Sequence, residues 1–348
     1  MNNRQLTFAR EFRGFSQTEL ANSIAGLSQS NLSKFEKGLD SLSENTQSKI
    51  IEFLGFPTEF FERKIGNTIE NANYRKKATI SKAVVQEFEY KCRLIGYIVD
   101  QMSEDIDWPP FTFAPLNVEE GFSPSYVANY NRKLCKLSAD APVKDIITIV
   151  EGKGVIVYEL DAYEKFDGVS FITDNGFPII IVNNTFSNDR KRFTIAHELG
   201  HLLLHNDSNF PVSAYRQKEK EANEFASEFL MPENEIKHSL RGLRLNDLGV
   251  LKQHWLTSMA SLLRRAKDLN CIDENRYKYF LIEMSRLGYS KKEPSNVFID
   301  EPKCFKSAYK LFTNELNYSN QELSKYFALP EDVLDEIFAF DKKLRVIR

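Results

Sequence analysis

The chain has 348 residues, more than the roughly 250 to 300 that one hydrophobic core usually serves, so we expect several domains. Its 42% hydrophobic and 27% charged residues are typical of soluble globular proteins and exclude a disordered or membrane-embedded chain. The polar start carries no signal peptide and no apolar run could span a bilayer, so we expect a cytoplasmic protein without membrane contact. A net charge of -3 excludes a strongly basic nucleic-acid binder, so any DNA contact must be local.

Residues 1–62 are predicted to form short helices that end at glycines. Ser16 and Glu19 have the spacing of a capping box, which predicts the start of the second helix. Ser28 is placed to cap a third helix over residues 29–37, whose inner stripe is apolar and whose outer face is polar. Short helices joined by a tight glycine turn are the layout of a helix-turn-helix DNA reader.

The outer face of the third helix carries amide and cationic side chains. Amides can pair with an adenine edge in the major groove, and lysine with guanine or phosphate. A small helical bundle with a merely solvated polar face fits the spacing equally well. The candidate DNA-reading residues on this face are Gln29, Ser30, Asn31 and Lys34.

Residues 10–38 resemble the Xre/Cro-type, lambda-repressor-like helix-turn-helix family. The resemblance lies in Arg-Gly-Phe-Ser-Gln-x-x-Leu-Ala and in Ser-Gln-Ser-Asn-Leu-Ser-Lys-Phe-Glu-Lys-Gly. It implies that Gln17 contacts the phosphate backbone of double-stranded DNA and that the polar face of the third helix reads the bases. The resemblance therefore favours DNA binding over a plain bundle.

Residues 67–121 are predicted to be a helical linker. A basic patch at residues 74–77 could extend a DNA footprint, although a solvated charged turn explains it better. An amphipathic stretch follows from Ser81 to about Met102, and two prolines after Trp108 mark a boundary because proline cannot continue a helix.

From Ser123 the pattern alternates between helix and strand. Ser123 is an expected helix cap with Pro124 at the first helical position, and residues 143–150 predict a second helix. Three short β-forming runs predict a small twisted sheet, at residues 155–160, 169–172 and 178–182.

Residues 193–205 contain the pattern H-E-x-x-H. On a helix, His197 and His201 lie on one face one turn apart, so their imidazoles can converge on one cation. Glu198 points to the side of the pair, where its carboxylate can take a proton from a metal-bound water. With only five histidines in 348 residues, a chance match is expected far less than once, which leaves a charged face on a core helix as the alternative.

A catalytic zinc site takes three protein ligands, so a third ligand is required. His205 lies a further turn along the same helix and could reach the ion only if that helix broke. A second helix over residues 217–231 is the better source. Its alternating Glu-Lys-Glu offers Glu219 and Glu221, which only helix phase can separate.

Residues 122–268 resemble the ImmA/IrrE metallopeptidase family. The resemblance lies in Arg-Phe-Thr-x-Ala-His-Glu-Leu-Gly-His-Leu-Leu-Leu-His and in Glu-x-x-Ala-Asn-x-Phe-Ala-x-x-x-Leu-Met-Pro. It implies a Zn²⁺ site whose third ligand is Glu219, with Glu198 as catalytic base, and Glu221 stays the competitor. Asn223, one turn after Glu219, is then placed to hydrogen-bond a ligand histidine.

Residues 233–348 look helical throughout, most clearly at 245–255, 258–269 and 274–287. Residues 319–334 hold a helix pair that could be a degenerate helix-turn-helix, although plain helical packing or a dimer module explains it better. The four cysteines lie far apart without a C-x-x-C pair, which argues against a thiolate zinc site and against a disulfide framework.

These patterns predict an α+β, mostly helical chain in four segments. They are a helix-turn-helix DNA-binding domain over residues 1–66, the linker over 67–121, a zincin-like metallopeptidase domain with a small sheet over 122–268, and a helical C-terminal domain over 269–348. Because the net charge is negative, one copy should bind DNA only modestly, so we expect a dimer or a partner at the operator.

The expected function is a DNA-binding transcriptional regulator with a zinc-dependent endopeptidase domain. By family resemblance, its substrate would be a repressor-type transcription factor, or the chain itself, in a stress, phage or mobile-element response. Two rivals remain: a transcription factor whose peptidase-like domain only senses metal or a partner, and an antitoxin-like repressor acting through protein contacts. The intact Glu198 argues against a pure sensor, which has no need of a general base.

Overall fold

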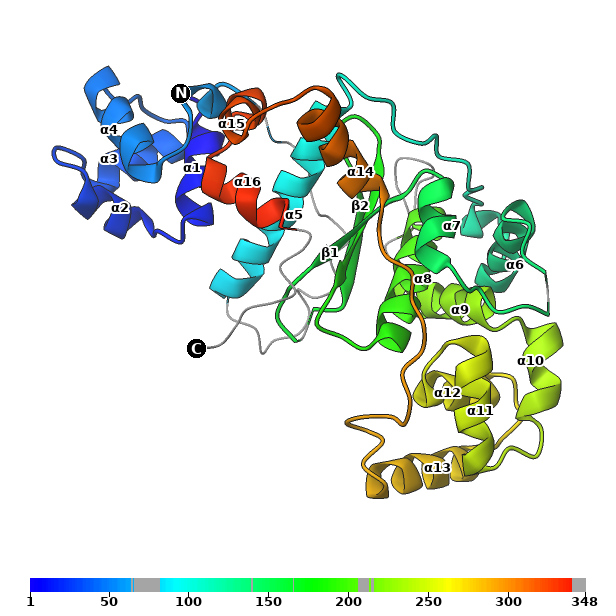
Figure 1. Cartoon of the computed structure of the whole chain (residues 1–348). Helices are drawn as coiled ribbons and strands as arrows, with labels where there is room; N and C mark the ends of the chain where they lie inside the picture. The colour runs from blue at the N-terminus through cyan, green and yellow to red at the C-terminus, as the bar shows by residue number, and fades with distance from the viewer. Residues whose placement is uncertain are drawn as a thin grey trace, which may run out of the picture. The chain divides into compact units, whose positions relative to one another are not determined.

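The computed structural model describes most of the chain, namely residues 1–63, 65, 82–138, 140–164, 166–205, 213 and 216–339. The predicted basic patch at 74–77 lies outside the described residues. Helices dominate and one small sheet is present, which confirms the α+β class (Figure 1). None of the helices described is both long and apolar enough to cross a membrane.

The chain divides into two compact units, both assembled from separate stretches of sequence. Unit 1 comprises Met1–Asp107, Ile172–Gly176 and Cys304–Arg348, and unit 2 comprises Trp108–Phe171 and Phe177–Lys303. The last helices therefore group with the first ones rather than with the residues just before them. These two units are not the four segments predicted from the sequence, whose boundaries stay predictions.

Unit 1 is built mainly of helices on the two chain ends. Its N-terminal helices are α1 (Asn3–Phe12), α2 (Gln17–Ser23), α3 (Gln29–Glu36), α4 (Glu44–Leu54), the 3-10 helix η1 (Thr58–Phe61) and α5 (Lys82–Met102). Its C-terminal helices are α14 (Cys304–Lys310), the π-helical η4 (Leu311–Glu315), α15 (Asn320–Phe327) and α16 (Glu331–Ile337).

Side-chain caps fix the starts of the N-terminal helices where the sequence predicts them. The capping box between Ser16 and Glu19 forms at α2, and the Ser28 side chain accepts from the backbone N–H of Asn31 at α3. Leu32 and Phe35 face the core of unit 1, which confirms the predicted inner stripe. Polar residues consequently cover the opposite face of α3.

Unit 2 places one sheet among helices from both of its sequence stretches. Its helices are η3 (Val118–Glu120), α6 (Pro124–Leu134), α7 (Ile146–Gly152), α8 (Asn188–Leu204), α9 (Lys218–Leu230), α10 (Glu233–Leu240), α11 (Leu245–Trp255), α12 (Met259–Asp268) and α13 (Glu274–Arg286). Its strands are β1 (Ile156–Leu160), β2 (Gly168–Ile172), of which only the last residue is assigned to unit 1, and β3 (Pro178–Asn183).

The sheet has the order β1-β3-β2, so β3 is central. β1 and β3 run parallel, with Ile156 opposite Ile179 and Leu160 opposite Asn183. Every residue of β3 is buried, as expected of a strand covered on both faces. The three predicted β-forming runs are therefore confirmed, each to within one residue of its expected bounds.

Two helix predictions need correction. The prediction of helix throughout residues 233–348 was wrong, because residues 287–303 between α13 and α14 form turns, bends and irregular chain. The helix expected from residue 143 begins only at Ile146. The first N–H groups of a helix have no partner within the helix, and here the carboxylate of Asp300 accepts hydrogen bonds from those of Ile147 and Thr148. A residue far away in the sequence therefore caps the start of α7.

Candidate functional site

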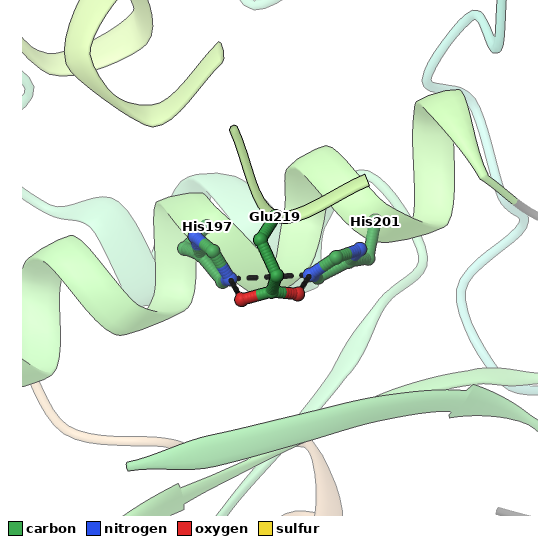
Figure 2. Close-up of side chains that lie close together, drawn as sticks. All are labelled: His197, His201 and Glu219. Carbon is green, nitrogen blue, oxygen red and sulfur yellow. Dashed lines mark hydrogen bonds and ion pairs between the residues drawn. The ribbon is translucent and has the colours of Figure 1, made fainter. Parts of the chain in front are cut away.

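The three predicted ligand side chains converge in unit 2. His197 and His201 project from α8 and Glu219 from the first turn of α9, and Figure 2 shows the two rings and the carboxylate pointing toward one another. The Nε2 atoms of the two histidines are 3.1 Å apart. Glu219 places Oε1 3.1 Å from His201 Nε2 and Oε2 3.6 Å from His197 Nε2.

The distances between these three ligand atoms fit a tetrahedrally coordinated metal ion. Ligands about 2.0 to 2.1 Å from a zinc ion at tetrahedral angles lie about 3.3 to 3.5 Å from one another. All three ligand atoms fall within 4.8 Å of one another, and His201 is buried while His197 and Glu219 are partly exposed. Two imidazole nitrogens and one carboxylate fit a divalent cation, and a tetrahedral ion held by three protein ligands takes its fourth ligand from water or substrate.

The hydrogen bond at His197 Nδ1 sets which of its nitrogens faces the site. Asn223 Oδ1 lies 3.2 Å from this atom and Asn223 Nδ2 donates to the backbone oxygen of Glu219, which orients the amide. His197 must therefore carry its proton on Nδ1, leaving the lone pair of Nε2 directed at the cluster.

The charges of the cluster favour a cation between its members. Burial lowers the pKa of His197, but the hydrogen bond with Glu219 and the charge of Glu198 outweigh burial and raise it overall. Burial raises the pKa of Glu219, yet its bonds with His197 and His201 lower it well below its usual range. The carboxylates thus stabilise a proton on His197, and the ring must release that proton before its Nε2 can hold a metal ion.

The two candidate carboxylates of α9 have different partners. Glu219 contacts both histidines of the pattern, whereas Glu221 Oε2 lies 2.8 Å from His205 Nε2 and Oε1 accepts from Arg216 at 2.7 Å. His205 is fully buried at the end of α8, and its Nδ1 lies 3.1 Å from His201 Nδ1. His205 and Glu221 therefore lie behind the cluster rather than in it.

His205 is held neutral by its surroundings. Burial lowers its pKa to about 4, although the hydrogen bond with Glu221 acts in the opposite direction. Arg216 and Glu221 also line an open cavity of about 480 Å³ beside α9. The chain of contacts that begins at the buried His201 therefore ends at a solvent-accessible surface.

Glu198 is buried beside the cluster and bonded to the sheet. Ser170 on β2 donates to Glu198 Oε2 at 2.8 Å, and both side chains are buried. The contact requires β2 to lie close to α8. A Cβ atom at Gly168 would lie 2.5 Å from Thr194 Cγ2, so glycine permits this approach. Ser170 thus fixes Oε2 of Glu198, and Oε1 is the oxygen that can accept a proton from water.

Buried polar contacts fix the position of α9. Glu228 accepts from Arg265 of α12 and from Asn129 of α6, and the buried Arg132 donates to the backbone oxygen of Phe229. Gly200 lets α9 approach α8, because a Cβ atom there would lie 3.3 Å from Ala222 Cα. Together these contacts bring Glu219 within reach of the two histidines.

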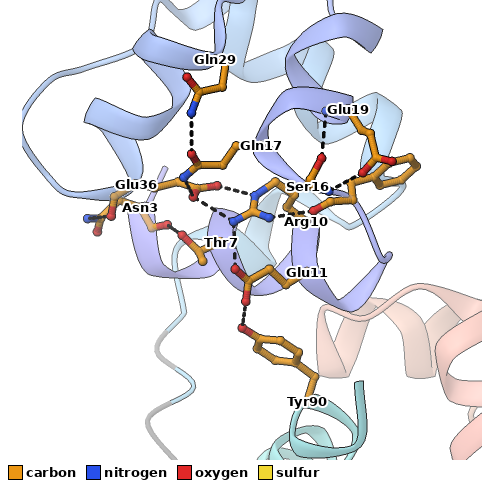
Figure 3. Close-up of polar contacts among 11 residues, drawn as sticks. Asn3, Thr7, Arg10, Glu11, Ser16, Gln17, Glu19, Gln29, Glu36 and Tyr90 are labelled. Carbon is orange, nitrogen blue, oxygen red and sulfur yellow. Dashed lines mark hydrogen bonds and ion pairs between the residues drawn. The ribbon is translucent and has the colours of Figure 1, made fainter. Parts of the chain in front are cut away.

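The predicted DNA-reading residues lie in unit 1 on the outer face of α3. Gln29, Ser30, Asn31 and Lys34 are exposed, and Gln17 of α2 is partly exposed. Gln29 Nε2 donates to Gln17 Oε1 at 2.9 Å, so these two amides pair with each other (Figure 3).

A buried ion pair lies on the inner side of α3, behind the polar face, and stabilises its position. Arg10 of α1 donates from Nε and Nη2 to the two oxygens of Glu36, whose side chain also accepts from Gln17 Nε2. Figure 3 shows this network joining α1, α2 and α3. The orientation of α3 relative to α2 is therefore fixed by hydrogen bonds as well as by apolar packing.

Sequence reasoning missed four residues around the cluster: Ser170, His205 as a partner of His201, Glu221 as a partner of His205, and Arg216. The spacing of His205, one further turn after His201, was the available signal. No sequence signal pointed to Ser170, because its hydrogen bond with Glu198 depends on how the sheet packs against α8.

One family model matches part of the chain. Residues 150–267 match the IrrE N-terminal-like domain of peptidase family M78. The match includes the three residues of the cluster and Glu198, and it confirms the predicted resemblance for less than half of the chain. This stretch is therefore similar to a metallopeptidase domain. No curated protein matches the chain.

Proposed function

We propose that the chain is a zinc-dependent endopeptidase joined to a DNA-binding module. The convergence of His197, His201 and Glu219 beside the buried Glu198 carries the peptidase part of the proposal. The match of residues 150–267 to a peptidase family supports it. By the resemblance, the substrate is a repressor-type transcription factor or the chain itself, and cleavage relieves repression.

His197, His201 and Glu219 would hold the ion. When bound, Zn²⁺ supplies a Lewis acid and lowers the pKa of water. Glu198 Oε1 would accept the proton of the attacking water and later deliver it to the leaving amide nitrogen. Ser170 would hold Oε2 of the same carboxylate during both transfers. Burial of Glu198 keeps bulk water from competing for these proton transfers.

The test compares the wild-type full chain with Glu198→Gln. We expect about one zinc ion per chain in both proteins, because the substitution leaves the three ligands untouched. Cleavage of the chain itself, or of repressors encoded beside it, should fall by a factor of about 10² to 10⁴ in the variant. Zinc binding without cleavage by the wild type would favour a metal sensor instead.

The DNA-binding part of the proposal rests on the exposed polar face of α3. Asn31 and Lys34 would contact base edges, and Gln17, whose amide pairs with Gln29, would contact the phosphate backbone. The module would bring the peptidase to the DNA on which its substrate sits. Deleting residues 1–66 should then reduce cleavage in cells, and unchanged cleavage would contradict this role.

Selection from random duplex DNA tests DNA binding directly. The wild-type chain should enrich one sequence, and Asn31→Ala should weaken binding to it by about 1 to 3 kcal/mol and relax the preference at one position. Lys278→Ala on α13 removes one exposed positive charge elsewhere and serves as the control. Equal enrichment by the wild type and Asn31→Ala would exclude α3 as the reading helix.

A further inference from the structure

Three residues outside the ligand set connect His201 to the protein surface. His201 Nδ1 lies 3.1 Å from His205 Nδ1, and His205 Nε2 lies 2.8 Å from Glu221 Oε2. Arg216 then donates to both carboxylate oxygens of Glu221, from Nη2 at 2.7 Å and from Nε at 3.1 Å. The four side chains form one continuous row of hydrogen bonds across α8 and α9.

The direction of these hydrogen bonds follows from what each group can offer. An ionised Glu221 only accepts, so His205 must carry its proton on Nε2. A His201 ring that holds a metal ion through the lone pair of Nε2 carries its proton on Nδ1, and His205 Nδ1, 3.1 Å away, can accept that hydrogen bond because the proton of His205 lies on Nε2. His201 must therefore donate from its own Nδ1, and its Nε2 is left with a lone pair facing His197 and Glu219.

We propose that Arg216, Glu221 and His205 form a positioning relay that fixes the ring of His201 with its Nε2 lone pair aimed at the metal. The proposal rests on the proposed function, because it assumes that the cluster binds a divalent cation. In metal sites generally, a partner on the far nitrogen of a ligand histidine fixes its tautomer and orientation, and losing it weakens metal binding about 10- to 100-fold. The relay does for His201 what Asn223 does for His197.

A purely structural role for the relay makes a different prediction. If Glu221 only tied α9 to α8, its loss would lower the melting temperature of the metal-free protein and leave metal affinity at lower temperature unchanged. If the relay sets the tautomer of His201, affinity must fall even where the protein is fully folded. The zinc dissociation constant, measured by chelator competition on the folded full chain, separates the two roles.

Variants at Glu221 are the first choice, because its side chain is partly exposed whereas His205 is fully buried. Glu221→Ala removes the acceptor of the His205 proton. Glu221→Gln keeps an acceptor oxygen at nearly the same place. Glu224→Ala is the matched control, since Glu224 lies on the same helix, carries the same charge and accepts from Ser125 at 3.0 Å instead.

We expect Glu221→Ala to bind zinc about 10- to 100-fold more weakly than the wild type. Glu221→Gln and Glu224→Ala should stay within about threefold of the wild type, because an acceptor for His205 remains in both. The Co²⁺-loaded protein gives a second readout. Its visible absorption bands should shift in Glu221→Ala and keep the wild-type positions in Glu224→Ala.

Substitution of His205 supplies an independent comparison. His205→Gln offers one donor and one acceptor, and should bind zinc more tightly than His205→Leu, which offers neither. Equal affinity of the wild type, Glu221→Ala and Glu224→Ala would overturn the relay while leaving the proposed metal site intact. A wild-type chain that binds neither Zn²⁺ nor Co²⁺ would overturn both proposals.

Discussion

At the scale of single residues, the missing side chain of Gly200 controls how closely α9 approaches the ligand histidines. A Cβ atom there would lie 3.1 Å from Phe225 Cδ1 and 3.3 Å from Ala222 Cα. The aromatic ring can rotate slightly, but the backbone of Ala222 can yield only if α9 moves. Because α9 carries Glu219, such a movement changes the geometry of the cluster.

Gly200→Ala should therefore weaken zinc binding about tenfold or more, since ligand distances tolerate changes of only about 0.2 Å. Gly249→Ala on α11 is the matched control, because it lies inside a helix and nothing approaches within 4 Å. The control should raise stability by up to about 1 kcal/mol and leave zinc affinity unchanged. Zinc titration and thermal melting measure both effects, and unaltered affinity in Gly200→Ala would contradict this account.

At the scale of elements, a buried lysine joins three segments of unit 2. Lys252 of α11 donates at 2.8 Å to Asp189 of α8 and at 2.8 Å to Glu293, which lies beyond α13. Glu293 also accepts from the backbone N–H groups at the start of α12. The ammonium group thus holds α8, which carries the histidines, against the helices that follow.

Lys252→Met should destabilise unit 2 by about 3 to 5 kcal/mol at pH 7, because the buried carboxylate of Asp189 and the partly buried carboxylate of Glu293 would lose their cation. Burial raises the pKa of Asp189 but the bond with Lys252 lowers it overall, so this stability is present above about pH 4 and is lost as pH falls further. Burial lowers the pKa of Lys252 and its two carboxylate bonds raise it overall, so the same stability is lost again above about pH 10.

Thermal melting across this pH range measures the effect. The melting temperatures of the wild type and Lys252→Met should differ by roughly 10 °C at pH 7 and converge as the pH falls below about 4 through the lowered pKa of Asp189. Lys278→Met removes an exposed lysine 3.8 Å from Glu274 and should change the melting temperature little. A difference that is independent of pH would show that packing, not charge, stabilises this contact.

The elements themselves were largely predictable because their signals are local. Caps such as Ser16 with Glu19, and the β-forming run that became β3, depend on residues close in sequence. The choice between Glu219 and Glu221 was different. Both carboxylates lie in the first turn of α9, and their partners depend on how α9 packs against α8, which no short pattern encodes. The relay from His201 to Arg216 escaped prediction for the same reason.

At the scale of the whole molecule, unit 1 is completed by the end of the chain. Phe312, Phe327 and Leu329 are fully buried, and Tyr97 of α5 donates from its hydroxyl to the backbone oxygen of Phe327 at 2.7 Å. Arg63 donates to the backbone oxygen of Tyr326 at 3.1 Å. These contacts join residues more than 200 positions apart, so sequence patterns gave no sign of them.

Deleting residues 304–348 should therefore destabilise the helices of residues 1–107. Each fully buried apolar side chain contributes about 1.5 to 3 kcal/mol, so losing three approaches the total stability of a typical domain. The deletion lies outside unit 2, so the truncated chain should still bind zinc. Limited proteolysis should cut the N-terminal helices of the truncated chain at least tenfold faster than those of the wild type.

Asp332→Asn is the control that separates buried packing from surface charge. Asp332 is 63% exposed and pairs with Arg13 through Oδ2 and Nη1 at 2.5 Å. Because an exposed ion pair contributes at most about 1 kcal/mol, this variant should resist proteolysis nearly as well as the wild type. A truncated chain whose N-terminal helices are as resistant as those of Asp332→Asn would show that unit 1 does not depend on its C-terminal helices. If the N-terminal helices are cut faster in the truncated chain but not in Asp332→Asn, then the stability of α3, the proposed DNA-reading helix, depends on residues 304–348.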